Sequence, residues 1–145
     1  MSEPEQASDY LDRLRAIPDH LRATAERHRA GSTAGRTGVE RLVRAAIAQT
    51  ERYVAGHGDD PFTGPTPPDG WDGASSWLDE GDRILADLVR PAVAAYGEAL
   101  AADVLPHARD LDHPGMCHLP NGAEDILGQA RKTVARAEAA APQWF

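Results

Sequence analysis

Apolar residues recur at helical spacing in four stretches of this chain, and this pattern constrains the fold more than any other feature. The clearest stretch runs from residue 39 to residue 54, where one stripe collects Val39, Leu42, Val43, Ala46, Ile47, Thr50, Tyr53 and Val54. Sustained alternation of apolar and polar residues, which is typical of half-buried strands, is missing. The sequence therefore predicts an all-α fold, a helical bundle of four to five helices.

The first helical stretch is expected to begin near Ser8, a residue type that suits the N-cap. Proline removes a backbone donor and clashes with the preceding turn, so Pro18 predicts a kink or a break. If the helix breaks, Pro18 starts a second helical segment, which is expected to end at Gly31. Residues 1–7 are expected to be a disordered N-terminus and residues 8–145 to form a single helical domain.

A third stripe starts after Ser75 or Ser76, either of which is expected to cap the helix. The stripe continues in phase through Pro91, so it predicts one long, kinked central helix that ends near Arg109. The last helix is expected to open at Asn121, whose spacing to Glu124 matches a capping box.

The last helix carries a weaker, alanine-rich stripe, formed by Ile126, Leu127, Ala130, Val134 and Ala137. Small side chains bury little area, so this helix needs neighbours. Trp144 and Phe145 follow it, and we expect these two aromatic residues to dock on the body or on another subunit.

The segment of residues 56–75 holds Gly or Pro at nine of its twenty positions. Gly56 and Gly58 are expected to stop the preceding helix. A connection of this length is typical of a lid, a binding loop or a disordered segment. Phe62 and Trp71 lie outside any periodic stripe, which favours a lid folded over one end of the bundle.

The chain has 23 acidic and 15 basic residues, a net charge of −8. This balance argues against nucleic acid and anionic membrane surfaces as partners, because phosphate binding needs a basic face. Cys117 is the only cysteine, so no intramolecular disulfide can form. The acidic start MSEPEQASDY lacks the basic and apolar regions of a signal peptide, and no apolar run approaches the roughly 18 residues of a membrane span. We therefore expect a cytoplasmic protein.

Several motifs occur in an order that resembles one bacterial family. They are YLDRLRAIPDHL, VERLVRAAIAQ, Arg-Pro-Ala at 90–92, Leu-Pro-x-Ala-Arg at 105–109 and Gly-x-x-x-Leu-Pro-x-Gly at 115–122. This order is similar to that of the domain of unknown function 885, over about residues 10–133. The resemblance implies a helical scaffold of the zinc-metallopeptidase type. The zinc motif of that family starts with His-Glu, and no histidine here precedes a glutamate, so the resemblance does not extend to peptidase activity.

The stretch RDLDHPGMCHLPNG, residues 109–122, is the densest group of reactive side chains. His113, Cys117 and His118 with Asp110 or Asp112 offer zinc ligands, but this spacing matches no common zinc pattern. The other interpretation is a turn between two helices, broken by its prolines and glycines. We expect the turn, with no metal and no cofactor.

The histidines of this turn also fit metal-independent acid–base chemistry, because carboxylates surround them. In this interpretation the catalytic residues are His113, His118 and Glu124, and the ligand-binding residues are Arg109, Trp71, Phe62 and Tyr96. The competing interpretation is that His107 and Arg109 only complement the negative end of a helix.

Two functions fit these patterns. The first is a small-molecule-binding protein of bacterial, specialised metabolism, with or without acid–base catalysis, on a peptidase-like scaffold fragment. The second is a non-catalytic interaction module or truncated remnant, acting as a homodimer or with a partner chain. A ligand pocket would favour the first function, and an exposed apolar face or a symmetric interface would favour the second.

Overall fold

The computed structural model describes residues 1, 3–56 and 60–140, and these residues contain helices and no strand. The predicted all-α fold is confirmed. The helices in chain order are α1 (Pro4–Thr33), α2 (Glu40–Val54), α3 (Ala74–Ile84), α4 (Arg90–Ala99) and α5 (Gly122–Ala140). None of the helices in the described residues has both the length and the apolar character that crossing a bilayer requires. Trp144 and Phe145, expected to dock, lie outside the described residues.

Helix α1 begins at Pro4, earlier than the predicted Ser8. Proline is favoured in the first helical turn, where its missing N–H costs nothing. Ala7 is fully buried, and the amino group of Met1 donates a hydrogen bond to the carbonyl of Thr66 at 2.9 Å. The expectation of disorder over residues 1–7 is therefore replaced by a packed, helical start in the described part of that segment.

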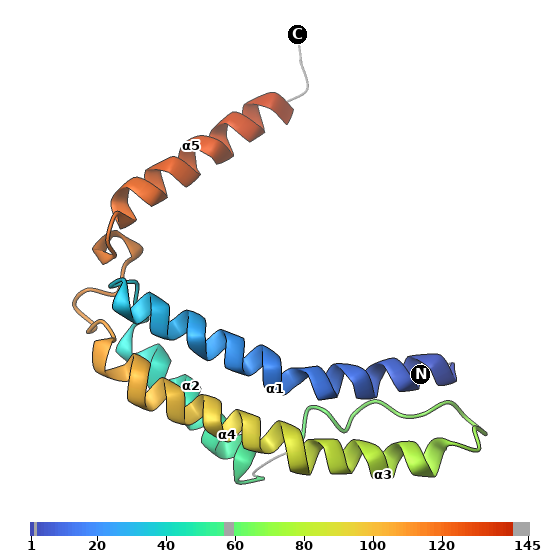
Figure 1. The fold of residues 1–145 in the computed structure, drawn as a ribbon. Coiled ribbons are helices and arrows are strands. Elements are labelled where there is room, and N and C mark those ends of the chain that lie inside the picture. Colours follow the sequence, from blue (N-terminus) through green and yellow to red (C-terminus); the bar gives the residue numbers. More distant parts are fainter. Residues whose placement is uncertain (2, 57–59, 141–145) are drawn as a thin grey trace.

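Pro18 lies inside α1 and does not end it. The helix changes direction partway along (Figure 1), as expected for an internal proline. The predicted end at Gly31 is wrong, because α1 continues to Thr33. Gly35 then takes φ +71°, the left-handed conformation that glycine adopts at helix C-termini, and its N–H donates to the carbonyl of Ser32.

Helix α2 follows the prediction closely, since Val39 is its N-cap and Gly56 follows its end with φ +70°. The long central helix is also confirmed as one bent rod. It comprises α3, a π-helical turn η1 (Leu85–Val89), α4, a second π-helical turn η2 (Leu100–Val104) and a 3-10 turn η3 (Leu105–His107). Pro91 is the second residue of α4, so the wider π-helical turn η1 ends just before the position at which proline lacks a backbone donor. The N-cap of α3 is Gly73, which has no side chain to cap the helix. The predicted caps Ser75 and Ser76 are therefore wrong.

The apolar core forms two clusters along this rod. The first joins the N-terminal half of α1 to α3 and η1 and consists of Ala7, Leu11, Leu14, Trp77, Ile84, Leu85 and Val89. The second joins α2 to η2 and consists of Val43, Leu100 and Val104. Helix α4 packs against both α1 and α2, so the rod is the shared element of the fold.

The glycine- and proline-rich connection packs against the first cluster. Phe62 and Trp71 contact that cluster, and the hydroxyl of Tyr10 donates to the carbonyl of Phe62 at 2.6 Å. Gly73 is required here, because a Cβ at this position would lie 2.4 Å from the ring of Trp71. The described part of this connection is thus a packed cover of the first cluster.

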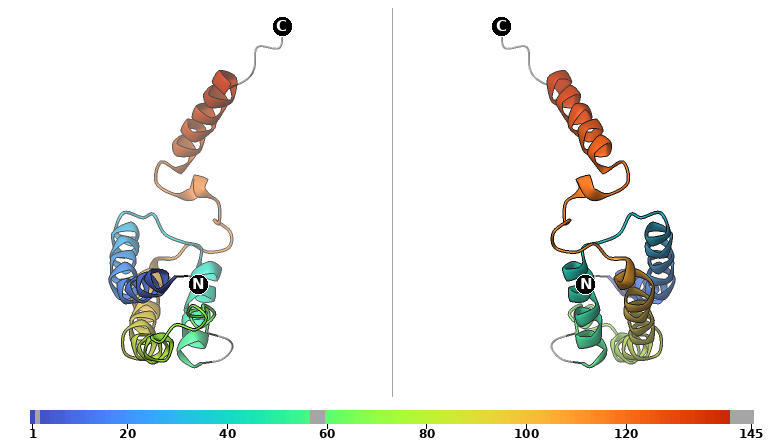
Figure 2. Two further views of the ribbon diagram at one scale, coloured as in Figure 1. Left: turned by 90° about the vertical axis from the view of Figure 1, so that its right-hand side faces the viewer. Right: turned by 90° about the vertical axis from the view of Figure 1, so that its left-hand side faces the viewer.

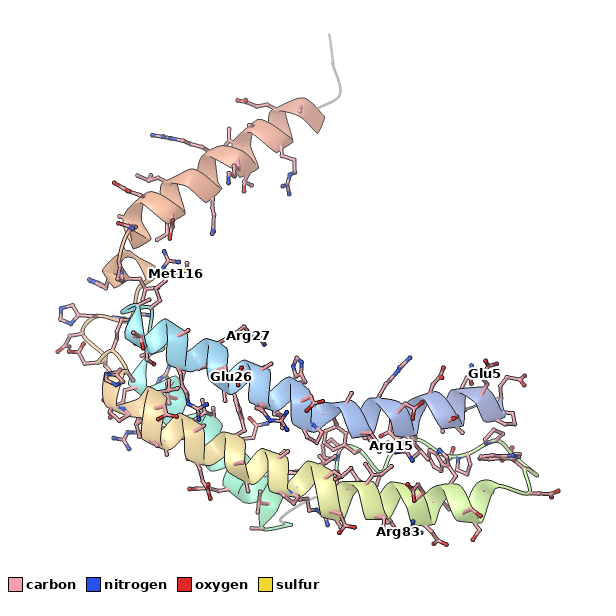
Figure 3. All side chains as sticks on the ribbon, in the orientation of Figure 1. Glu5, Arg15, Glu26, Arg27, Arg83 and Met116 are labelled. Atoms are coloured by element: carbon pink, nitrogen blue, oxygen red, sulfur yellow. The ribbon has the colours of Figure 1, made fainter. Side chains whose placement is uncertain are left out.

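Helix α5 stands apart from the packed helices (Figures 1 and 2). A 3-10 turn, η4 (Met116–His118), joins it to the body, and Gly122 fits against the carbonyl of Met116 with no room for a Cβ. Asn121 has φ +58°. Its side chain forms no capping hydrogen bond in the described structure, which differs from the predicted capping box with Glu124. Side chains project freely around α5 (Figure 3).

Candidate functional site

Arg109 organises the turn between η3 and α5. Its guanidinium donates to the carbonyls of Thr37 at 3.1 Å, His113 at 3.2 Å and Gly115 at 2.5 Å. Its backbone forms an isolated bridge with Val39, at the start of α2. These contacts use Nε and Nη1, so Arg109 holds the turn against α2 and keeps the donors of Nη2 for another partner.

Asp110 and His113 form a carboxylate–imidazole pair in this turn. The Oδ1 atom of Asp110 lies 2.9 Å from Nδ1 of His113 and also accepts the backbone N–H groups of Asp112 and His113. When Nδ1 donates this bond, Nε2 is left with a lone pair that can accept a proton. The hydrogen bond from His113 lowers the pKa of Asp110.

A shallow hollow of about 400 Å³ opens beside this pair. It is lined by Ala108, Arg109, Asp110, His113 and His118, and the His118 ring lies edge-on to that of His113, with 5.0 Å between centroids. The histidine and aspartate side chains of the pair are mostly exposed. Within the described residues, no group of three or more His, Cys, Asp or Glu side chains is arranged to hold a metal ion.

The other predicted site residues lie elsewhere. Glu124 is exposed on α5 and does not line the hollow. Phe62 and Trp71 pack on the first core cluster and do not close the hollow. Tyr96 packs beside the second cluster, where its hydroxyl lies 3.2 Å from Nε2 of His28 and burial raises its pKa. The structure therefore brings together only Arg109, His113 and His118 from the predicted set.

Sequence reasoning missed a polar cluster under the long connection. The Asp60 carboxylate, whose side chain is only 14% exposed, accepts from Arg90 at 3.1 Å and from the Phe62 N–H at 3.0 Å. The hydroxyl of Tyr53 lies 3.4 Å from the same carboxylate. Burial, and then the charge of Asp60, raise the pKa values of Tyr10 and Tyr53. The cluster anchors the connection to α4, and no short motif marks it because its members are far apart in the sequence.

The Asp110–His113 pair predicts a measurable titration. In the folded protein the pKa of Asp110 lies below its ordinary value of 3.8, so the pair stabilises the fold above that pH. This contribution is lost as the pH falls below 3.8 through the lowered pKa. We expect His113→Ala to move the midpoint of Asp110, followed by NMR of its carboxyl carbon, upward towards 3.8.

His118→Ala is the matched control for this titration, because His118 lines the same hollow without bonding to Asp110. It should leave the Asp110 midpoint in place. An unchanged midpoint in His113→Ala would show that the imidazole does not hold the carboxylate.

The chain was also compared with known proteins. No curated protein and no solved structure matches it. Residues 1–125 match the model of one family, described as a bacterial protein of unknown function (DUF885). The matched span covers most of the chain and includes the motifs at 90–92, 105–109 and 115–122. This chain therefore belongs to the DUF885 family.

Proposed function

We propose that this chain is an interaction module whose helix α5 is an arm that docks on another protein chain. The carrying observation is the apolar face of α5, defined here as the arm stripe Ile126, Leu127, Ala130 and Val134. Ile126 is 39% exposed, Leu127 57% and Val134 55%. In proteins most of the stability of a helix comes from packing of its apolar face and not from helix propensity alone. A covering partner therefore accounts for both the stripe and the helix.

The base of the arm is attached to the body while its stripe is left free. Arg36 forms an ion pair with Asp125 at 2.6 Å and donates to the carbonyl of Pro120 at 3.3 Å. Pro120 also lies against Gly35 at the end of α1. These contacts stop at the first turn of α5, so they orient the arm and leave the stripe for a partner.

Native mass spectrometry of the gently purified chain tests this proposal. We expect the chain in particles heavier than the single-chain mass of 15.6 kDa. The triple variant Ile126→Gln, Leu127→Gln, Val134→Gln removes the apolar face but keeps a good helix former at each position, and it should return to the single-chain mass.

The control variant is Lys132→Gln, on the side of α5 opposite the stripe, and it should assemble like the wild type. A wild-type chain found only at 15.6 kDa would contradict the proposal.

A second candidate is a small-molecule-binding protein with metal-independent acid–base chemistry. The observation that favours it is the Asp110–His113 pair, which leaves Nε2 of His113 beside an open hollow. The same spectra test it, since a retained ligand adds mass to the wild-type chain and should be lost in His113→Ala. The shallow, open shape of the hollow makes this candidate second to the first, because metabolite sites usually enclose most of their ligand.

A further inference from the structure

Arg109 carries a positive charge that no carboxylate of the described chain neutralises by an ion pair. Its side-chain hydrogen bonds run from Nε and Nη1 to the neutral carbonyls of Thr37, His113 and Gly115. Among the described residues it forms no ion pair, and Nη2 donates to no partner. A half-buried guanidinium with unused N–H groups suits an oxyanion, because charge-assisted hydrogen bonds are stronger than bonds between neutral groups.

The hollow beside Arg109 brings two imidazole rings to the same place. The titratable and charged groups that line it are Arg109, Asp110, His113 and His118. Asp110 orients His113 through the hydrogen bond to Nδ1, so Nε2 is the ring nitrogen left for a group outside the turn. The hollow of about 400 Å³ is open, which admits a small anion or the anionic group of a larger molecule.

The charges that line the hollow balance while both imidazoles are neutral, because Arg109 is positive and Asp110 is negative. A proton on Nε2 of His113 makes the hollow positive and adds a donor that faces away from the carboxylate. The bond between Nδ1 and Asp110 is kept, since Nδ1 donates in both states of the ring. The whole chain has a net charge of −8, so its long-range field does not attract an anion and binding depends on these close donors.

We infer that this hollow binds an oxyanion, the phosphoryl or carboxylate group of a small molecule, and takes up a proton with it. Nη2 of Arg109 and the protonated Nε2 of His113 donate to the anion, while Asp110 offsets one of the two positive charges. The proton comes from solvent and stays on the imidazole, so no bond of the bound molecule breaks. This inference rests on the second candidate function, the small-molecule-binding protein, and names the class of its ligand.

A cleft between α1 and α4 also contains cations, but it is a poorer match for an oxyanion. Its charged lining residues are Arg22 and Arg29. Arg22 already pairs with Asp19 at 2.6 Å, and Arg29 pairs with Asp103 at 2.5 Å. An anion in this cleft would have to compete with a carboxylate for each guanidinium, whereas Arg109 has no such partner among the described residues.

Nitrogen NMR of the full chain tests the inference, with sodium sulfate and sodium acetate as probes. Sulfate stands for a phosphoryl group and acetate for a carboxylate, and near neutral pH neither probe takes up a proton itself. Sodium chloride keeps the ionic strength constant, so that screening does not change during the titration. We expect Nε2 of His113 to shift towards the imidazolium with saturation, and the guanidinium of Arg109 to shift with the same midpoint. The probe that saturates at the lower concentration identifies the preferred oxyanion.

Two variants separate binding from the structural role of the turn. His113→Gln keeps a side-chain donor but cannot take up a proton, and it should weaken binding of the preferred probe, followed at Arg109, by at least about 10-fold. Arg109→Gln should weaken binding, followed at Nε2 of His113, by a similar factor. The low titration midpoint of Asp110 should persist in Arg109→Gln, which shows that the turn is intact. Where that midpoint moves instead, His113→Gln decides.

The matched control is His107→Ala, because His107 is exposed on the neighbouring turn η3 and does not line the hollow. It should bind both probes like the wild type. The absence of a saturable shift with either probe would overturn the inference, and so would saturation without protonation of His113. The small-molecule candidate still stands in those cases if native mass spectra show a retained ligand that His113→Ala loses. Without such a ligand, both fail.

Discussion

Replacement of Trp77 with alanine is expected to lower the free energy of unfolding by about 3–5 kcal/mol. The Trp77 side chain is 7% exposed in the first core cluster, and its ring centroid lies 5.9 Å from that of Tyr10. Its Nε1 donates to the carbonyl of Ala7 at 2.6 Å. The substitution therefore removes a large buried side chain and the indole donor that bonds to the Ala7 carbonyl, and it loosens α1 from α3.

Urea denaturation followed by helical circular dichroism measures this effect. Trp77→Phe is the matched control, because it keeps one aromatic ring while it removes the donor and part of the buried indole, and it should lose less stability than the alanine variant. A loss below about 1 kcal/mol for the alanine variant would place Trp77 among surface residues and contradict the packing of the first cluster.

Replacement of Gly97 with leucine is expected to lower the free energy of unfolding by about 1–3 kcal/mol. A Cβ at position 97 would lie 2.4 Å from Oγ1 of Thr50, which itself donates to the carbonyl of Ile47 at 2.7 Å. The larger side chain must therefore push α4 away from α2 or displace Thr50.

Thermal and urea denaturation should show this loss for Gly97→Leu and nearly none for Ala102→Leu, the control on the exposed side of the same rod. Equal stability of the two leucine variants would mean that α2 and α4 do not pack as closely as the structure places them.

The helical class could be predicted because the apolar stripes recur at a fixed period. The stripe from residue 39 to residue 54 gave both ends of α2, and the in-phase stripe through Pro91 indicated one bent rod. Helix ends were less predictable. Several residues near an end can serve as a cap, and packing selects among them. At the N-terminal end of α1, burial of Ala7 favours a helix that begins earlier, at Pro4. At its C-terminal end the left-handed residue is Gly35, although Gly31 could adopt the same conformation.

The candidate site could be predicted only where its members are neighbours in the sequence. Arg109, His113 and His118 belong to one turn, so local geometry brings them together. Phe62 and Trp71 have no period that indicates the surface they cover, and the anchor between Asp60 and Arg90 directs them to the first core cluster. Glu51 of α2 and Glu98 of α4 line one hollow on the surface, and no single stretch of sequence encodes the relative orientation of these two helices.

The two core clusters have a consequence for how the protein comes apart. The first holds the N-terminal half of α1 against α3 and η1, and the second holds α2 against η2. The bent rod contributes buried residues to both, and Tyr53 of α2 also packs against the first cluster. The second cluster has fewer buried members, so we expect amide hydrogens at its end of the rod to exchange with solvent before those of the first cluster.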